Sequence, residues 1–464
     1  MTFNSPEFAV FLPIVLLGYF LISARHWRGR KAWLLVASYA FYMSWNPGFV
    51  ILLLITTLAD FVLARQIERT RDPAGRRALL LLSIGTNLGM LGFFKYGAFV
   101  FANTAWLLRP LLGDRTAVFD VVLPIGISFY TFESLSYTID VYRGRIAACR
   151  SLLDFSLFLA FFPHLVAGPI VRPATFLPQL DAPPRMREAA VEDALARIVI
   201  GLVKKVLLAD LLGEYVDRVF DVPSAYAGTN VLLAIYAYAF QIYYDFAGYT
   251  DIALGVAGLF GLVLPENFDR PYLAESPRDF WRRWHISLST WLRDYLYVPL
   301  GGDRISPRRT AWNLFVTMVL GGLWHGAAWH FVAWGAYHGG LLAGERALHD
   351  RGVPWLPATV TGRRLITFHL VCLGWVLFRA PDIAGAANVL RNLWGWGFVS
   401  SRLATQTAIL VAVAAALHAG LPARDARAAW VRIPPWAQGA AYAAVFGAML
   451  LLAPASARFI YFQF

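Results

Sequence analysis

The chain has 464 residues, of which 58% are hydrophobic and only 15% are charged. Soluble globular chains usually hold about 25% charged residues, so this composition argues against a soluble protein and favours an integral membrane protein. The net charge of +12 would suit nucleic acid, but the basic residues fall in loops between apolar runs, as the positive-inside rule describes.

Apolar runs long enough to cross a bilayer recur along the chain. A membrane helix needs ~20 residues, and on this criterion we expect roughly ten to twelve membrane segments. The runs do not alternate polar with apolar residues, which predicts helices rather than barrel strands. The clearest runs are Phe8–Ser23, Phe49–Ala64, Leu79–Phe94, Val231–Phe246 and Ala440–Ala453.

The first run and its flanking charges predict how the chain enters the membrane. The opening residues MTFNSPEFAVFLPIVLLGYF have no basic n-region and no A-x-A-like cleavage site, so we expect an uncleaved span. The basic clusters at 25–31 and 65–77 are two spans apart, and both can be cytoplasmic if the N-terminus is extracytoplasmic. Without a linker or fixed-period repeat, we interpret residues 1–464 as one membrane domain.

Five ionisable residues lie in or beside apolar segments: Lys95, Glu133, Asp140, Asp245 and Asp251. Charged side chains at membrane depth are costly and usually face a cavity or a partner. Pairing within the helix bundle and a functional role both remain open for them. The functional interpretation is stronger for Asp245 and Asp251.

Residues 276–298 predict one amphipathic helix at the cytoplasmic interface, or folded into a cavity there. Ser276 is a typical N-cap, Pro277 suits the first helical position, and Asp279 stands where a capping-box acid belongs. His285 is the residue that a simple membrane anchor does not require. An aromatic stripe recurs at steps of three and four: Trp281, Trp284, Leu288, Trp291 and Tyr295.

The apolar segment GGLWHGAAWHFVAWGAYHGG, residues 321–340, carries His325, His330 and His338. On one continuous helix, His330 lies ~140° around from His325, and His338 lies ~80° further, so the three share no face. No H-E-x-x-H or paired-cysteine pattern occurs in the sequence. We therefore expect no metal site.

A single catalytic histidine fits this segment better, and His325 is the best candidate. A buried imidazole is biased towards the neutral form that a general base needs. Glycines on both sides let another segment approach closely, and Trp324 and Trp329 can wall a dry pocket. A hydrogen-bonded packing histidine is the open alternative, and we prefer it for His330 and His338.

The pair of motifs DFWRRWHISLSTWLRDYLYVPLGG and GGLWHGAAWHFVAWGAYHG resembles the membrane-bound O-acyltransferase (MBOAT) family, and within it the bacterial alginate O-acetylation branch, AlgI and its relatives. The likeness runs from Asn87 to Phe464 and is densest in the core motifs, 241–340. His164 stands where those relatives usually carry Gln. Other similar segments are NLGMLGFFKYGAF, LPIGISFYTFESLSYTIDVYRG, FPHLVAGPIVRP, YYDFAGYTDIALG, ENFDRPY and the terminal FIYFQF.

The resemblance implies a ring of tilted transmembrane or re-entrant helices around a central tunnel, with cytosolic interfacial helices. It implies that His325 is catalytic and that His285 is the second catalytic position. It also implies transfer of acetyl from cytosolic acetyl-CoA across the bacterial inner membrane to an extracytoplasmic polysaccharide. An alginate-like polymer is expected, with cellulose and peptidoglycan open. Expected partners are membrane lipid, a periplasmic SGNH-hydrolase-like acetyltransferase and the polysaccharide synthesis and export complex.

In this reaction His325 takes the proton of the attacking hydroxyl or acts on the acyl group, and His285 orients or polarises the thioester. Arginines near His285 suit the donor phosphates, although solvated loop charge explains any single one equally well. A transporter and a non-catalytic scaffold remain as alternatives, but related halves typical of transporters are not visible. The expected donor-binding residues are Arg278, Arg282, Arg283, Trp284, Arg293, Trp324 and Asp251.

Overall fold

The computed structural model describes residues 1–112, 121–184, 187–356, 359–395, 397, 399–420, 429–430 and 432–452. Helices and the turns that join them make up these ranges, and no strand occurs within them. The all-α prediction is confirmed. The terminal motif FIYFQF, 459–464, and Ala453 at the end of the last apolar run lie outside the described residues.

The chain folds into two compact units. The first holds residues 1–190 and 256–265, and the second holds residues 191–255 and 266–464. The single membrane domain stays a prediction.

Several helices have the length and apolar character that a multi-pass membrane protein requires. Within the described residues four qualify, and a bent pair, Pro6–Leu21 with Ala24–Met43, can supply a fifth span. The larger count of ten to twelve segments stays a prediction. The four helices are Pro47–Arg69, Pro73–Ala105, Val360–Arg379 and Arg402–Ala419.

A buried polar cluster joins three helices of the first unit. Asp60 on α3 accepts hydrogen bonds from Ser83 and Asn87 on α4, each at 2.6 Å, and from Ser134 on α6. A carboxylate with several donors is tolerated among apolar helices because its charge is compensated. The helices of this unit are α1 (Pro6–Leu21), α2 (Trp27–Met43), α3 (Val50–Arg69), α4 (Pro73–Leu91), α5 (Gly97–Leu112), α6 (Ile127–Tyr142), α7 (Leu152–Ala160), α8 (Phe162–Leu165) and α9 (Pro173–Phe176).

Three of the ionisable residues at apolar segments find partners in the first unit. Glu133 lies 3.0 Å from Nδ1 of the fully buried His164. The Lys95 ammonium donates to the Ser128 hydroxyl at 3.1 Å, and Asp140 lies 3.4 Å from an Arg145 guanidinium nitrogen. These contacts match the pairing interpretation for Lys95, Glu133 and Asp140.

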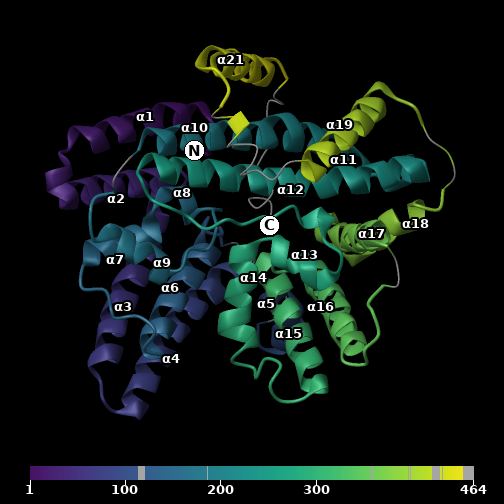
Figure 1. Ribbon diagram of the computed structural model, residues 1–464. Helices are drawn as coiled ribbons and strands as arrows, with labels where there is room; N and C mark the ends of the chain where they lie inside the picture. Colours follow the sequence, from purple (N-terminus) through teal and green to yellow (C-terminus); the bar gives the residue numbers. More distant parts are fainter. Residues whose placement is uncertain are drawn as a thin grey trace. The chain divides into compact units, whose positions relative to one another are not determined.

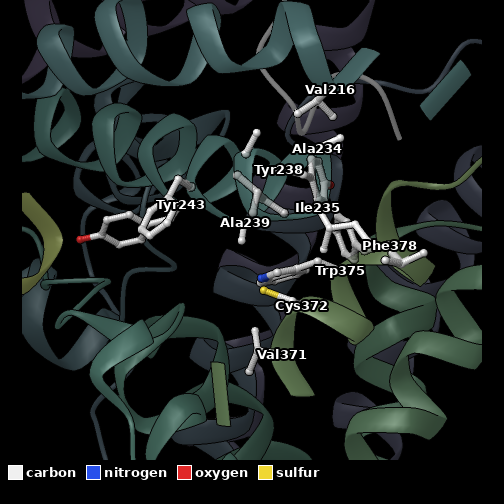
Figure 2. Packing of buried hydrophobic residues seen from close by; sticks show 14 of the residues in the cluster. Val216, Ala234, Ile235, Tyr238, Ala239, Tyr243, Val371, Cys372, Trp375 and Phe378 are labelled. Atoms are coloured by element: carbon white, nitrogen blue, oxygen red, sulfur yellow. The ribbon is translucent and has the colours of Figure 1, made fainter. Parts of the chain in front are cut away.

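Helices α12 and α17 build much of the core of the second unit. Ile235 and Ala239 of α12 face Trp375 of α17, and all three are buried (Figure 2). The Trp375 indole N–H donates to the Tyr272 hydroxyl at 3.1 Å, which satisfies its polar atom. The helices are α10 (Glu188–Leu202), α11 (Asp210–Asp221), α12 (Gly228–Leu259), α13 (Pro277–Arg283), α14 (Ile286–Leu292), α15 (Pro307–His325), α16 (Trp329–His349), α17 (Val360–Arg379), α18 (Ile383–Asn392), α19 (Arg402–Ala419) and α21 (Pro435–Leu452).

The prediction of one helix over residues 276–298 is wrong, because the chain breaks at His285. Helix α13 begins as predicted, with Ser276 accepting from the Asp279 N–H, but His285 has φ of 43° and α14 starts after it. A left-handed residue interrupts the helical hydrogen-bond ladder. The peptide groups released at the break pair instead with the segment around Asn267: the Asp269 N–H donates to the Arg283 carbonyl at 2.9 Å.

The segment 321–340 is likewise not one helix, so the angular argument about its three histidines does not apply. Helix α15 ends at His325, and α16 begins at Trp329 and returns along it (Figure 1). Glycines permit the close approach. A Cβ on Gly322 would lie 2.2 Å from the Phe331 carbonyl oxygen, and one on Gly335 would lie 2.4 Å from that of Met318.

Candidate active site

Asn267 holds His285 at the break between α13 and α14. The Asn267 carbonyl accepts from the Ile286 N–H at 2.9 Å. Its side-chain Oδ1 accepts from the N–H and the hydroxyl of Ser287, at 3.1 and 2.9 Å. The same Oδ1 lies 3.1 Å from Nδ1 of the fully buried His285. An amide oxygen only accepts, so the hydrogen of the neutral imidazole resides on Nδ1.

Burial keeps this imidazole neutral. His285 lies outside the candidate spans, and loss of hydration lowers the pKa of its ring to about 3. With the hydrogen on Nδ1, Nε2 presents a lone pair, and this buried atom has no hydrogen-bond partner within the described ranges. In this state His285 can accept a hydrogen bond but cannot donate one from Nε2.

His325 is the last residue of α15 and is enclosed by aromatic rings. Its ring centroid lies 5.0 Å from that of Trp324, 5.1 Å from Trp334 and 5.2 Å from Phe378. The Trp324 ring is also 6.2 Å from the His285 ring. The fold therefore brings both predicted catalytic histidines against one indole, although they are 40 positions apart in sequence.

His330 and His338 occupy packing positions. Nδ1 of His330 donates to the Leu377 carbonyl at 3.0 Å, and the His338 ring lies 5.0 Å from that of Trp334. Trp329, suggested as a pocket wall, is 56% exposed. The described part of the chain contains no group of three or more His, Cys, Asp or Glu residues that could hold a metal ion.

A cavity of about 540 Å³ lies beside α14 in the second unit. Three of the predicted donor-binding arginines, Arg278, Arg282 and Arg293, line it. Ile286, which follows His285 in the chain, is also part of the wall. The cavity therefore reaches the residue next to His285, but the rings of His285 and His325 are not part of its lining.

Two other predicted donor-binding residues do not line this cavity. Nε of Arg283 lies 2.9 Å from Asp279, and its Nη1 lies 3.8 Å from Asp269. Trp284 is buried, with its ring centroid 4.8 Å from that of Trp375. The Arg283 side chain therefore forms ion pairs in the structure, and the Trp284 side chain packs in the hydrophobic core.

Sequence comparison with known proteins identifies the family of this chain. The sequence model of MBOAT, the membrane-bound O-acyltransferase family, matches residues 145–351, which include both histidines. "Probable alginate O-acetylase AlgI" of Pseudomonas aeruginosa is 42% identical over 401 residues, 86% of this chain and 75% of that protein. This chain belongs to the MBOAT family. The protein of the same name from Pseudomonas putida is 42% identical over 403 residues, 86% of this chain and 81% of that protein.

A relative named for another polymer shares the same extent of sequence. "Peptidoglycan O-acetyltransferase" of Helicobacter pylori is 35% identical over 432 residues, covering 86% of this chain and 81% of that protein. This MBOAT protein is therefore a membrane O-acyltransferase, which sets aside the transporter and scaffold alternatives.

Trp324 and Asp251, the two remaining predicted donor-binding residues of this MBOAT protein, are also not part of the cavity lining. Asp251 lies in a charge cluster. Its Oδ2 is 2.5 Å from the Lys204 ammonium, and its Oδ1 is 3.9 Å from Arg197. Asp245 similarly lies 2.5 Å from Lys205. These pairs stabilise helix packing by compensating buried charge.

We expect Asp251→Ala to lower the stability of the MBOAT protein by about 3–5 kcal/mol, because Lys204 and Arg197 lose a partner in a largely buried site. Thermal unfolding in detergent, followed by tryptophan fluorescence, measures the change. Asp217→Ala is the control, since Asp217 pairs with Arg379 but is 58% exposed. An unaltered unfolding temperature with weaker donor binding would instead favour the donor-binding role predicted for Asp251.

The sequence analysis missed two residues of this site. Asn267 was quoted only within the motif ENFDRPY, and nothing in its local pattern indicates that it contacts His285. Arg346 on α16 lines the cavity beside the three expected arginines and lies 2.9 Å from Asp350. Arg346 is far from His285 in the sequence and lies on a different helix, so a search for basic residues near His285 in the sequence does not find it.

Proposed function

We propose that this MBOAT protein moves an acetyl group from cytosolic acetyl-CoA across the bacterial inner membrane, for O-acetylation of an extracytoplasmic polysaccharide. In this proposal the N-terminus is extracytoplasmic, and a periplasmic acetyltransferase and the polymer synthesis complex are the partners. The relatives named alginate O-acetylase favour an alginate-like acceptor over peptidoglycan. The observation that carries the proposal is the arginine-lined cavity next to His285.

The cavity has the chemistry that a coenzyme A donor requires. Coenzyme A is phosphate-rich, and guanidinium groups bind phosphate oxygens through paired, charge-assisted hydrogen bonds. Arg278 and Arg282 have no ion-pair partner for their side chains within the described residues, which leaves their donors available. Apolar wall residues, among them Trp281, Leu292 and Met318, suit the pantetheine arm.

The reaction divides between the two histidines. His325 takes the proton from the acceptor hydroxyl as its oxygen attacks the thioester carbonyl. The new C–O bond forms, the C–S bond breaks, and the proton on His325 passes to the leaving thiolate. His285 orients the donor by accepting a hydrogen bond at Nε2 from an amide N–H of the pantetheine arm. Polarisation of the carbonyl by His285, the other role considered, needs a donor that this tautomer lacks.

We expect the double variant Arg278→Gln, Arg282→Gln to raise the KM for acetyl-CoA at least about tenfold, with a much smaller change in kcat. Each arginine supplies charge-assisted hydrogen bonds worth about 1.5–3 kcal/mol, and these contacts bind the donor far from the reacting carbon. KM and kcat are measured from the initial rate at which the purified protein releases free coenzyme A in the presence of an acceptor polymer.

Arg283→Gln is the matched control, because Arg283 is on the same helix but pairs with Asp279 outside the cavity lining. Its KM should stay near that of the wild type. Donor binding at this cavity is refuted if the double variant and the control show the same KM. Substrate exchange across vesicles without coenzyme A release would contradict the acyl-transfer proposal itself.

A further inference from the structure

We propose that Asn267 is a positioning residue that fixes the tautomer of His285, so that Nε2 acts as a hydrogen-bond acceptor in acyl transfer. This inference rests on the proposed role of His285 in orienting the donor. It assigns a task to a residue that does not itself touch the substrate.

The orientation of the Asn267 amide is decided by its other contacts. The backbone N–H of Ser287 can only donate, and it lies 3.1 Å from the side-chain oxygen of Asn267. A flipped amide would place its NH2 group against that N–H, and the contact would be lost. The oxygen therefore faces Ser287 and, at 3.1 Å, Nδ1 of His285.

The Asn267 oxygen is the nearer of two groups that reach Nδ1 of His285, because the Ser287 hydroxyl lies 3.5 Å from Nδ1 and donates at 2.9 Å to Asn267. Nδ1 must donate to the Asn267 oxygen, and a neutral imidazole holds one ring hydrogen, so Nε2 keeps its lone pair. His285 is fully buried, and Nε2 has no hydrogen-bond partner among the residues that the structure describes. A buried polar atom without a partner is costly, and a group that donates a hydrogen bond to Nε2 would remove this cost.

The aromatic surroundings of His285 offer no alternative control of the tautomer. The Phe246 ring meets the imidazole edge-on at 4.7 Å, and the Trp324 ring lies at 6.2 Å. Neither contact selects between the two ring nitrogens. Among the charged groups on the segments around the ring, Arg278 and Arg282 of α13 line the cavity, and His325 is the titratable group across the indole. The other charged groups on these segments form ion pairs: Asp245 with Lys205, Asp251 with Lys204, Glu266 with Arg197, Asp269 and Asp279 with Arg283, and Asp294 with Arg293.

A purely structural role for Asn267 makes a different prediction. If Asn267 only supports the left-handed turn at His285, any side chain that accepts the same three hydrogen bonds should serve equally well. Aspartate is such a side chain, with nearly the same shape. It differs in carrying a negative charge next to Nδ1, which favours the imidazolium.

The test compares Asn267→Asp with wild type over pH, using the initial rate of coenzyme A release by the purified full chain. We expect Asn267→Asp to remain active and to show an added loss of rate at acid pH that the wild type lacks, since a nearby opposite charge raises a histidine pKa by about 1–3 units. The protonated ring cannot accept at Nε2, so kcat falls. Asn267→Leu, which frees the tautomer, should lose about 10²-fold in rate.

Asn230→Asp is the matched control. Asn230 is a buried asparagine of the same unit whose amide contacts Tyr215 and Val399 and no histidine, so its variant should show no shift of the acid limb. An unshifted pH profile for Asn267→Asp, or a wild-type rate for Asn267→Leu, overturns the proposal. The proposal is also overturned if neither Asn267 variant folds while His285→Asn does, because Asn267 would then be needed for folding rather than for positioning His285.

These outcomes are separable from the wider proposal. A wild-type rate in a His325→Ala protein would refute the proposed function, whatever the Asn267 variants do. An unshifted profile in an enzyme that needs His325 would refute only the positioning role.

Discussion

His325→Ala is expected to lower the rate of acetyl transfer by about 10²–10⁴-fold, the contribution of a positioned general base, while membrane insertion and protein level stay normal. The residue closes α15 inside a wall of Trp324, Trp334 and Phe378 rings. Bulk water is largely kept from a ring so enclosed, so no solvent base replaces the lost imidazole. Coenzyme A release and acetyl content of the polymer measure the effect.

His325→Gln is the more informative partner of this variant, because it keeps most of the side-chain volume and limits the cavity left behind. The matched control is His338→Gln, at a buried histidine of α16 that packs against Trp334. This control should cost stability rather than transfer. Wild-type acetylation by either His325 variant would remove the catalytic assignment.

The second large effect is expected for His285→Asn, whose kcat/KM should fall about 10²-fold. Misplacement of a bound reacting group slows a reaction by about this factor. Asparagine tolerates the left-handed backbone better than most residues, so the break between α13 and α14 at φ of 43° is preserved. Its short side chain cannot present an acceptor where Nε2 lies. Circular dichroism and thermal unfolding should match wild type, and a full rate would contradict the role.

His285 is not expected to limit the rate of the wild-type enzyme at mildly acid pH. An ordinary histidine loses its neutral form below pH 6.5, whereas burial lowers the pKa of His285 to about 3. The direction is downward, so the neutral acceptor persists as the pH falls through 6.5. The rate measured in buffers above and below that value should show no decline that belongs to His285.

The sequence alone determined the class of this protein and singled out His325 as the candidate catalytic histidine, which stays a prediction. Apolar runs with basic loops between them define a helical membrane protein, because length and charge placement suffice for that conclusion. The helix cap at Ser276 was also readable, since capping depends on residues three positions apart. His325 stood out because it follows Trp324 among glycines in an apolar segment.

Only the tertiary structure decided how the two histidines are held and which groups surround them. The break at His285 depends on Asn267, which is 18 positions away, and helix periodicity carries no information about a partner at that distance. The turn between α15 and α16 depends on glycines whose contacts come from the facing helix. Likewise, Arg282 lines the cavity whereas Arg283 binds Asp279 and Asp269. Contacts between remote segments settle these choices, because they fix which atoms of a side chain are already bonded to the rest of the protein.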